Sequence, residues 1–130
     1  MPVKNNYSKQ FGNWGEKVAC EYLEEKGIRI VATNIHSRFG EIDILAQDEY
    51  GFRLIEVKTR SNSTFGKGEE SVSKPKIDRI IATWELYKLK HPDLPENAQI
   101  DVIVVEKKAR KDPPVITYLE NVNIGASFGE

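Results

Sequence analysis

Apolar residues recur at intervals of three and four in two stretches of the chain, and each stretch predicts an amphipathic helix. The first helix is predicted from Phe11 to a stop at Gly27, after a largely polar segment, residues 1–10, that we expect to be flexible. The second is predicted to begin near Ser73, with Pro75 in its first turn, and to end before Pro92. Their apolar positions are Phe11, Trp14, Val18, Ala19, Tyr22 and Leu23 in the first helix, and Ile77, Ile80, Ile81, Trp84 and Tyr87 in the second.

Five shorter stretches have the alternation or the β-branched content of strands. They are residues 28–33, 41–46, 54–59, 100–105 and 115–119, the fourth of which is expected to be buried within the sheet. The resulting order, α-β-β-β-α-β-β, predicts an α/β fold in which a mixed β-sheet is flanked by helices. The length of 130 residues suits a single domain spanning 1–130, and residues 121–130 are expected to be flexible, like residues 1–10.

The second and third predicted strands form a hairpin that brings acidic side chains together. If residues 48–51 are a four-residue loop, Asp43 lies directly opposite Glu56, and Glu41 lies opposite Lys58. Directly opposed residues have Cβ atoms about 4.5–5.5 Å apart. Two carboxylates at that separation repel each other unless a positive charge lies between them. The hairpin therefore predicts a site for a cation.

The alternation of the same strands also predicts which side chains share a face. Glu41 and Asp43 are expected on one face, with Ile42 and Ile44 on the other. Glu56 and Lys58 are likewise expected to share a face. Apolar Leu45 and Leu54 are predicted to lie beside the acids, so that the acidic face is partly covered.

A divalent cation such as Mg²⁺ suits this face, because it takes one or two carboxylates together with water and phosphate oxygens. Lys58, next to Glu56 on the same face, is placed to offer a proton or a charge to a water or a phosphate. Together these groups suit metal-assisted hydrolysis of a phosphodiester. The alternative is an ordinary hairpin with a solvated face, in which Glu41 and Lys58 form a cross-strand salt bridge.

Asp43, twelve intervening residues and Glu56-Val57-Lys58 resemble the PD-(D/E)XK signature of metal-dependent nucleases. A longer set of residues resembles the YraN-like family, a bacterial family of small proteins related to archaeal Holliday-junction resolvases. The resemblance covers about residues 10 to 105, with a weaker echo at 119–128. Its residues are Gly12, Gly15-Glu16, Ala19, Tyr22-Leu23, Gly27, Asn34, Gly40-Glu41-Ile42-Asp43, Glu56-Val57-Lys58-Thr59-Arg60 and Phe65-Gly66.

This resemblance implies a restriction-endonuclease-like fold and an endonuclease of branched or structured DNA, expected to act as a homodimer. It implies that Asp43 and Glu56 bind Mg²⁺ or Mn²⁺, that Lys58 orients the attacking water, and that Glu16 completes the acidic cluster. Gly12, Gly15 and Ala19 are expected to let the first helix approach the sheet closely. Glu41 and Thr59 are candidate accessory residues. Asp101 follows Gln99-Ile100, where relatives often have Arg-Phe, and is not assigned to the site.

The net charge of the whole chain argues against nucleic acid as a partner. It is −1, because 19 Lys and Arg residues nearly balance 20 Asp and Glu residues. Along the chain, however, residues 58–90 hold eight basic and four acidic residues, directly after the acidic hairpin. Phosphate contacts are therefore expected from Arg60, Lys67, Lys74, Lys76 and Arg79. DNA is the expected partner, with RNA left open, and a binding module of the same fold that cuts nothing is the alternative function.

Two further features bear on where the protein acts. Cys20 is the only cysteine in the sequence, which rules out a disulfide framework and fits a reducing cytoplasm. No apolar run approaches the roughly 18–20 residues needed to span a bilayer. The expectation is therefore a cytoplasmic protein that does not bind a membrane.

Overall fold

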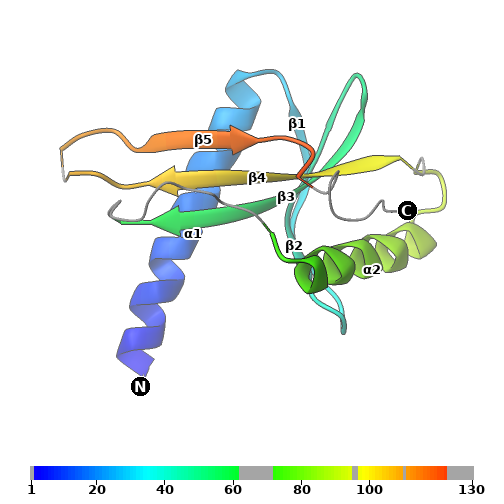
Figure 1. The fold of residues 1–130 in the computed structure, drawn as a ribbon, viewed down its shortest axis with the longest axis horizontal. Helices are drawn as coiled ribbons and strands as arrows, with labels where there is room; N and C mark the ends of the chain where they lie inside the picture. Colours follow the sequence, from blue (N-terminus) through cyan, green and yellow to red (C-terminus); the bar gives the residue numbers. More distant parts are fainter. Residues whose placement is uncertain (1, 62–71, 95–96, 110, 123–130) are drawn as a thin grey trace.

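The computed structural model describes residues 2–61, 72–94, 97–109 and 111–122, with side chains from Ser8 onward. The elements follow the predicted order (Figure 1). They are α1 (Pro2–Glu25), β1 (Arg29–His36), β2 (Glu41–Asp48), β3 (Gly51–Arg60), α2 (Lys74–Lys90), β4 (Ala98–Glu106) and β5 (Val115–Leu119). No helix in these ranges is long and apolar enough to cross a membrane.

The five strands form one sheet in the order β1-β2-β3-β4-β5. β3 and β4 run parallel, and every other neighbouring pair is antiparallel, so the sheet is mixed as predicted. A parallel neighbour requires a crossover connection, and α2 lies in the segment that makes it. Residues 100–105 of β4 are buried, because the strand has a neighbour on either side.

Each face of the sheet has its own apolar core. α1 lies against β1 to β4 on one face and is drawn behind the sheet in Figure 1, and α2 lies against β2 on the other. The core under α1 contains Ala19, Leu23, Ile28, Ile44, Ala46, Ile55, Ile103 and Val105. The core under α2 contains Ile42, Leu45, Phe52, Leu54, Ile77, Ile80, Trp84 and Ile100.

The C-terminal end of α1 and the N-terminal end of α2 are both capped. α1 stops as predicted at Gly27, whose φ of 84° lies in the left-handed region that favours glycine, and the Ile28 N–H donates to the Leu23 carbonyl at 2.9 Å. α2 begins after Ser73, whose hydroxyl accepts a hydrogen bond from the Lys76 N–H at 3.3 Å.

The start of α1 differs from the prediction. The helix begins at Pro2, not near Phe11, and its N-terminal part extends beyond the edge of the sheet (Figure 1). Apolar periodicity marks where a helix is buried, so a polar helical segment that leaves the sheet has no such signal. Flexibility of residues 1–10 stays a prediction, and most of residues 121–130 lie outside the described ranges.

The hairpin between β2 and β3 has the predicted register but a shorter loop. Gln47 pairs with Phe52 as expected, and one further pair, Asp48 with Gly51, reduces the loop to Glu49 and Tyr50. The Asp48 carboxylate stabilises this turn by accepting hydrogen bonds from the N–H groups of Tyr50 and Gly51. The four-residue loop was therefore wrong, although the register derived from it holds for this part of the hairpin.

Candidate functional site

The predicted site lies where β2 and β3 separate. Their pairing ends at Ile44 and Ile55, whereas β3 stays paired with β4 as far as Arg60 and Glu106. Figure 1 shows β3 continuing beside β4 and β5 while the β1–β2 hairpin turns toward α2. We call this separation the fork, and define it as residues 41–43 of β2 and residues 56–58 of β3.

Asp43 bridges the two arms of the fork. Its Oδ2 accepts a hydrogen bond from the backbone N–H of Val57 at 2.9 Å, in place of a backbone partner from β2. The predicted pairing of Asp43 with Glu56 is therefore wrong in detail, because the strands no longer pair at this point. Glu41 does not pair with Lys58 either; its carboxylate lies 3.1 Å from Nδ1 of His36, its neighbour on β1.

The backbone changes face at the same point. Ile42 packs under α2 and Ile44 packs under α1, although the alternation predicted that both would lie on one face. The registers of the β1–β2 pairs on either side place Asn34 beside Asp43, and Asn34 has a φ of 52°. This left-handed backbone conformation is rare in residues other than glycine, and Asn is among the few residues that tolerate it. The local irregularity explains why simple alternation fails here.

β3 keeps its alternation through the fork. Phe52 and Leu54 pack under α2, and Ile55 packs under α1. Glu56 and Lys58 therefore share the α2 side of the strand, as predicted. Both are half-buried.

Glu16 reaches the fork from α1 because the helix lies directly on β3. A Cβ atom on Gly15 would lie 2.9 Å from Cγ2 and 3.1 Å from Cβ of Thr59, and would also collide with the Thr59 hydroxyl. Only glycine fits at this crossing. Ala19, in the next turn, is fully buried, whereas Gly12 has nothing within 4 Å of its would-be Cβ. The predicted close approach is therefore confirmed for Gly15 and Ala19 and wrong for Gly12.

Four acids act on one another electrostatically at the fork. Burial raises the pKa of the Asp43 carboxyl to about 7, the Val57 hydrogen bond opposes this shift, and Glu56, Glu16 and Glu41 add to it. Burial also raises the pKa of Glu16, opposed by a hydrogen bond from the Asn34 side chain, with Glu41 and Glu56 adding repulsion. The fork is thus a half-buried concentration of negative charge.

These acids lie near one another, but they do not form a complete set of metal ligands. Within the ranges that the structure describes, no three His, Cys, Asp or Glu side chains form a group that could hold a metal ion. The structure brings Glu16, Asp43 and Glu56 together from three different elements. It does not by itself assemble them into a three-carboxylate site.

The predicted phosphate contacts are distributed differently. Lys76 points into the fork, where its Nζ lies 3.3 Å from Oε2 of Glu56, and Lys74 forms an exposed pair with Asp78 at 3.0 Å. Arg79 is exposed one turn along α2 and, with Lys76, lines a pocket of 290 Å³ beside the β1–β2 turn. Arg60 ends β3, and Lys67 lies outside the described residues.

Sequence reasoning gave no role to Asn34, and it expected Lys76 to contact phosphate rather than an acid of the fork. Asn34 supports Glu16, and Lys76 provides a positive charge beside Glu56. Asn34 was visible only as part of the family resemblance. The pairing of Lys76 has no local sequence signal, because it joins residues 20 positions apart on α2 and β3.

Asp101 has a structural role outside the fork, as its exclusion from the site implied; it pairs with Ile55, next to the fork, but its side chain bonds to other residues. It is fully buried and accepts hydrogen bonds from Arg53 at 3.1 Å, from the Tyr118 hydroxyl at 2.6 Å and from the Asn121 N–H at 2.9 Å. Arg53 also pairs with Asp48 at 2.6 Å. These contacts tie β2, β3, β4 and β5 together on the side of the fork that faces the β2–β3 turn.

Comparison with known proteins places the chain among close relatives. Residues 15–105 match the family described as Uncharacterised protein family UPF0102. The UPF0102 protein of Campylobacter lari is 41% identical over 115 residues, which cover 87% of this chain and 93% of the relative. That of Dichelobacter nodosus is 32% identical over 122 residues, covering 94% and 95%. That of Syntrophomonas wolfei is 34% identical over 98 residues, covering 75% and 85%. The family match spans the whole fork.

Proposed function

The chain belongs to the UPF0102 (YraN-like) family, and we propose that it is a Mg²⁺- or Mn²⁺-dependent endonuclease that hydrolyses phosphodiester bonds of branched or structured DNA. One observation carries the proposal. Glu16, Asp43 and Glu56 come from three elements to one half-buried fork, where the pKa of Asp43 is raised to about 7. A bound cation would relieve the repulsion among these carboxylates, as a proton on Asp43 does in its absence.

The donor atoms at the fork suit a hard divalent cation. All of them are carboxylate oxygens, and Mg²⁺ needs only one or two such ligands from the protein when water and phosphate oxygens complete its shell. Asp43 and Glu56 would hold the ion, and Glu16 would act on it directly or through water. A bound ion would lower the pKa of a coordinated water and stabilise negative charge on the phosphate.

The chain's own residues have distinct tasks in this proposal. The Val57 hydrogen bond fixes the Asp43 carboxylate at the opening of the fork. Lys58 shares a strand face with Glu56, from which its ammonium group can orient a water and offset charge on a phosphate. Lys76 neutralises Glu56 in the free protein and is available to a phosphate oxygen once a cation takes its place. Arg79 and Lys74 extend the basic surface along α2.

A second candidate is a DNA-binding module of the same fold that does not cut. The observation that favours it is the absence, among the described residues, of a converged group of three metal-binding side chains. Such a module would bind DNA through α2 and would cut no substrate, with or without Asp43. The two candidates therefore differ in one measurable property.

The test is cleavage of a four-way junction, a flap, a linear duplex and a single strand, each of defined sequence, by the full chain with Mg²⁺ or Mn²⁺. We expect metal-dependent cutting of at least one branched substrate. Asp43→Ala and Lys58→Met are expected to reduce it by about 100-fold or more, because each removes a group that acts on the reacting phosphate. Tyr50→Ala, in the β2–β3 turn at the other end of the hairpin from the fork and 82% exposed, is the matched control and is expected to leave cutting unchanged.

Binding measurements separate the two candidate functions. Titration with Mn²⁺ is expected to show binding by the wild type that Asp43→Ala weakens. No cutting of any substrate, together with no divalent binding, would remove the nuclease proposal. DNA binding that persists under those conditions would then support the binding module.

A further inference from the structure

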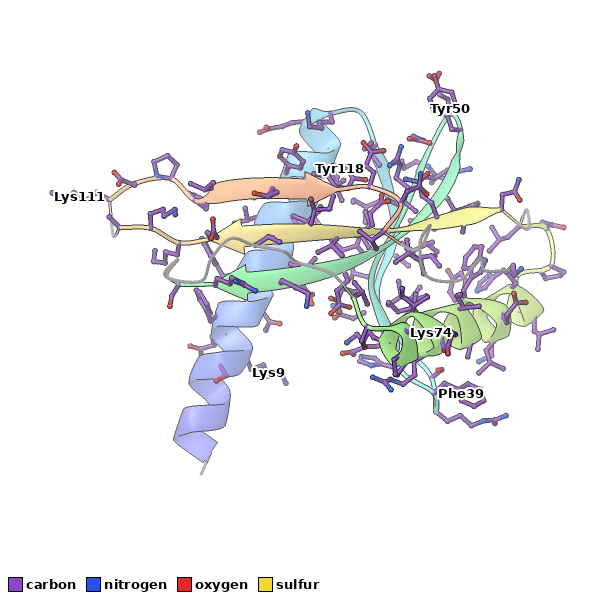
Figure 2. The ribbon with its side chains drawn as sticks, in the orientation of Figure 1. Lys9, Phe39, Tyr50, Lys74, Lys111 and Tyr118 are labelled. Atoms are coloured by element: carbon purple, nitrogen blue, oxygen red, sulfur yellow. The ribbon has the colours of Figure 1, made fainter. Side chains whose placement is uncertain are left out.

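The turn between β1 and β2 presents an aromatic ring to solvent. Phe39 is 42% exposed, and the guanidinium carbon of Arg38 lies 5.0 Å from the centre of its ring. Figure 2 shows Phe39 at the tip of this turn, beyond α2 and pointing away from the sheet. A planar cation over an exposed ring forms a stacking surface, because both groups favour contact with flat π systems.

The turn that carries Phe39 is held in one conformation. The Ser37 hydroxyl accepts hydrogen bonds from the N–H groups of Phe39, at 3.0 Å, and Gly40, at 3.2 Å. The same oxygen lies 2.8 Å from the hydroxyl of Thr83, a buried residue of α2. The turn is therefore anchored to α2, and little conformational entropy remains to be lost when the ring binds a partner.

The turn also lies next to the fork. A contact of 3.1 Å between Nδ1 of His36 and Oε1 of Glu41 lies at its base. Gly40 lies so close to α2 that a Cβ atom there would be 3.1 Å from Cβ of Arg79. The pocket of 290 Å³ between the turn and α2 is lined by Glu41 and by Lys76, which is also the partner of Glu56. The same few residues thus connect Phe39 to the acids of the fork.

We propose that Phe39 and Arg38 form a stacking contact for an unstacked DNA base beside the cleaved phosphate, so that the protein selects DNA with exposed base faces. The inference rests on the proposed function for the cutting step, but not for binding. In continuous duplex each base is covered on both sides, whereas a branch point or a single strand leaves a free face. Base stacking on an aromatic side chain tolerates any sequence and is worth about 5- to 150-fold in affinity per base.

The surroundings favour a nucleic acid over a protein partner. Arg38 covers the ring, and Arg79 and Lys76 line the adjoining pocket together with Glu41, so basic side chains outnumber acidic ones at this corner. Bases attached to a phosphate backbone match both the flat ring and that charge. A contact between two copies of this chain would bring like charges together.

The test compares Phe39→Ala, Phe39→Trp and the control Tyr50→Ala, all in the full chain. Affinity is measured by fluorescence anisotropy in Ca²⁺ for a four-way junction and for a linear duplex, with 2-aminopurine at the branch point reporting stacking. We expect Phe39→Ala to lose about 5- to 100-fold in affinity for the junction and less than about twofold for the duplex. Phe39→Trp should restore the junction affinity and the quenching of 2-aminopurine, and Tyr50→Ala should behave as the wild type.

The remaining outcomes either overturn the inference or support it independently of the nuclease proposal. Equal losses on both DNAs, no loss on either, or no DNA binding by the wild type would overturn it. A change of oligomeric state in Phe39→Ala with unchanged junction preference would assign the ring to a protein contact and also overturn it. If the wild type cuts DNA and Phe39→Ala cuts with the same preference, the inference fails while the nuclease stands. If the wild type selects junctions through Phe39 but cuts nothing, the inference stands without the nuclease.

Discussion

The carboxylate of Asp43 on β2 accepts a hydrogen bond from the backbone N–H of Val57 on β3, with 2.9 Å between Oδ2 and N. This contact stands where the backbone ladder between the two strands has ended. It holds an acid whose charge is disfavoured by burial and by three neighbouring carboxylates. The arrangement stores electrostatic free energy that a cation or a proton can release.

The pKa of Asp43 makes stability depend on pH when divalent ions are absent. Its folded value of about 7 lies above the unfolded value of about 3.9, so the folded state holds a proton that the unfolded state has lost between these limits. The free energy of unfolding therefore falls as pH rises from about 4 to 7. Urea unfolding in EDTA across this range should show the wild type losing on the order of 2 kcal/mol more than Asp43→Asn, less than the full shift because the side chain is partly exposed.

Asp43→Asn is a suitable comparison because its amide oxygen can still accept the Val57 hydrogen bond while carrying no charge. At pH 8 the variant should therefore be more stable than the wild type, and at pH 4 the two should be close. Parallel pH profiles for the two proteins would show that the charge of Asp43 is not destabilising.

Gly15 and Gly12 should respond oppositely to the same substitution. Gly15→Ala forces a methyl group into Thr59, and we expect a loss of about 1–3 kcal/mol in the free energy of unfolding together with displacement of Glu16. Gly12→Ala meets nothing within 4 Å and should stabilise the helix by about 0.5–1 kcal/mol. Chemical denaturation of both variants checks the pair. A mild effect of Gly15→Ala would mean that α1 can shift away from β3.

Lys76 competes with a cation for Glu56, so its removal should strengthen metal binding. Lys76→Gln is expected to raise the affinity for Mn²⁺ by about two- to tenfold, because a positive charge 3.3 Å from a ligand oxygen is lost. Lys74→Gln removes a neighbouring lysine that pairs with exposed Asp78, and serves as the matched control with no expected change. Isothermal titration measures both. Equal affinities in all three proteins would place the cation away from Glu56.

The network around Arg53 should dominate the stability of the far end of the sheet. Arg53→Met leaves Asp101 buried without its charge partner, and we expect a loss of about 3–5 kcal/mol in the free energy of unfolding. Tyr118→Phe removes the hydroxyl that donates to Asp101 and accepts from Arg53, and should cost about 1–2 kcal/mol. Adding Asp101→Leu to Arg53→Met should recover part of the loss, because the uncompensated charge is gone. A double variant as unstable as Arg53→Met would point to Asp48 as the more important partner.

Local chemistry was enough to predict most of the fold. The alternation of β2 and β3, the apolar content of β4, and the stops at Gly27 and Pro92 gave all seven elements in the right order, with β5 correct at both ends. The start of α1 was missed because the sequence of its first turns has no apolar period, and this part of the helix extends beyond the sheet. The nuclease relationship and the metal remain predictions.

The candidate site was only partly predictable. The register at Gln47 and Phe52 followed from the turn, and Glu56 and Lys58 share a face because β3 is regular. The opposition of Asp43 and Glu56 failed because it assumed that the two strands stay paired. Strand separation depends on long-range packing, in which β3 follows β4 and β2 follows β1 and α2.

The sequence by itself therefore determined which residues form helices and strands, which acids are available, and that Gly15 can permit a close helix crossing. These properties depend on neighbours within a few positions along the chain. Only the tertiary structure decided that the strands fork at Asp43, that Lys76 neutralises Glu56, and that Phe39 is exposed at the tip of the turn that leads into the fork. Those relationships join elements far apart in sequence, and their geometry depends on how two separate cores pack on opposite faces of one twisted sheet.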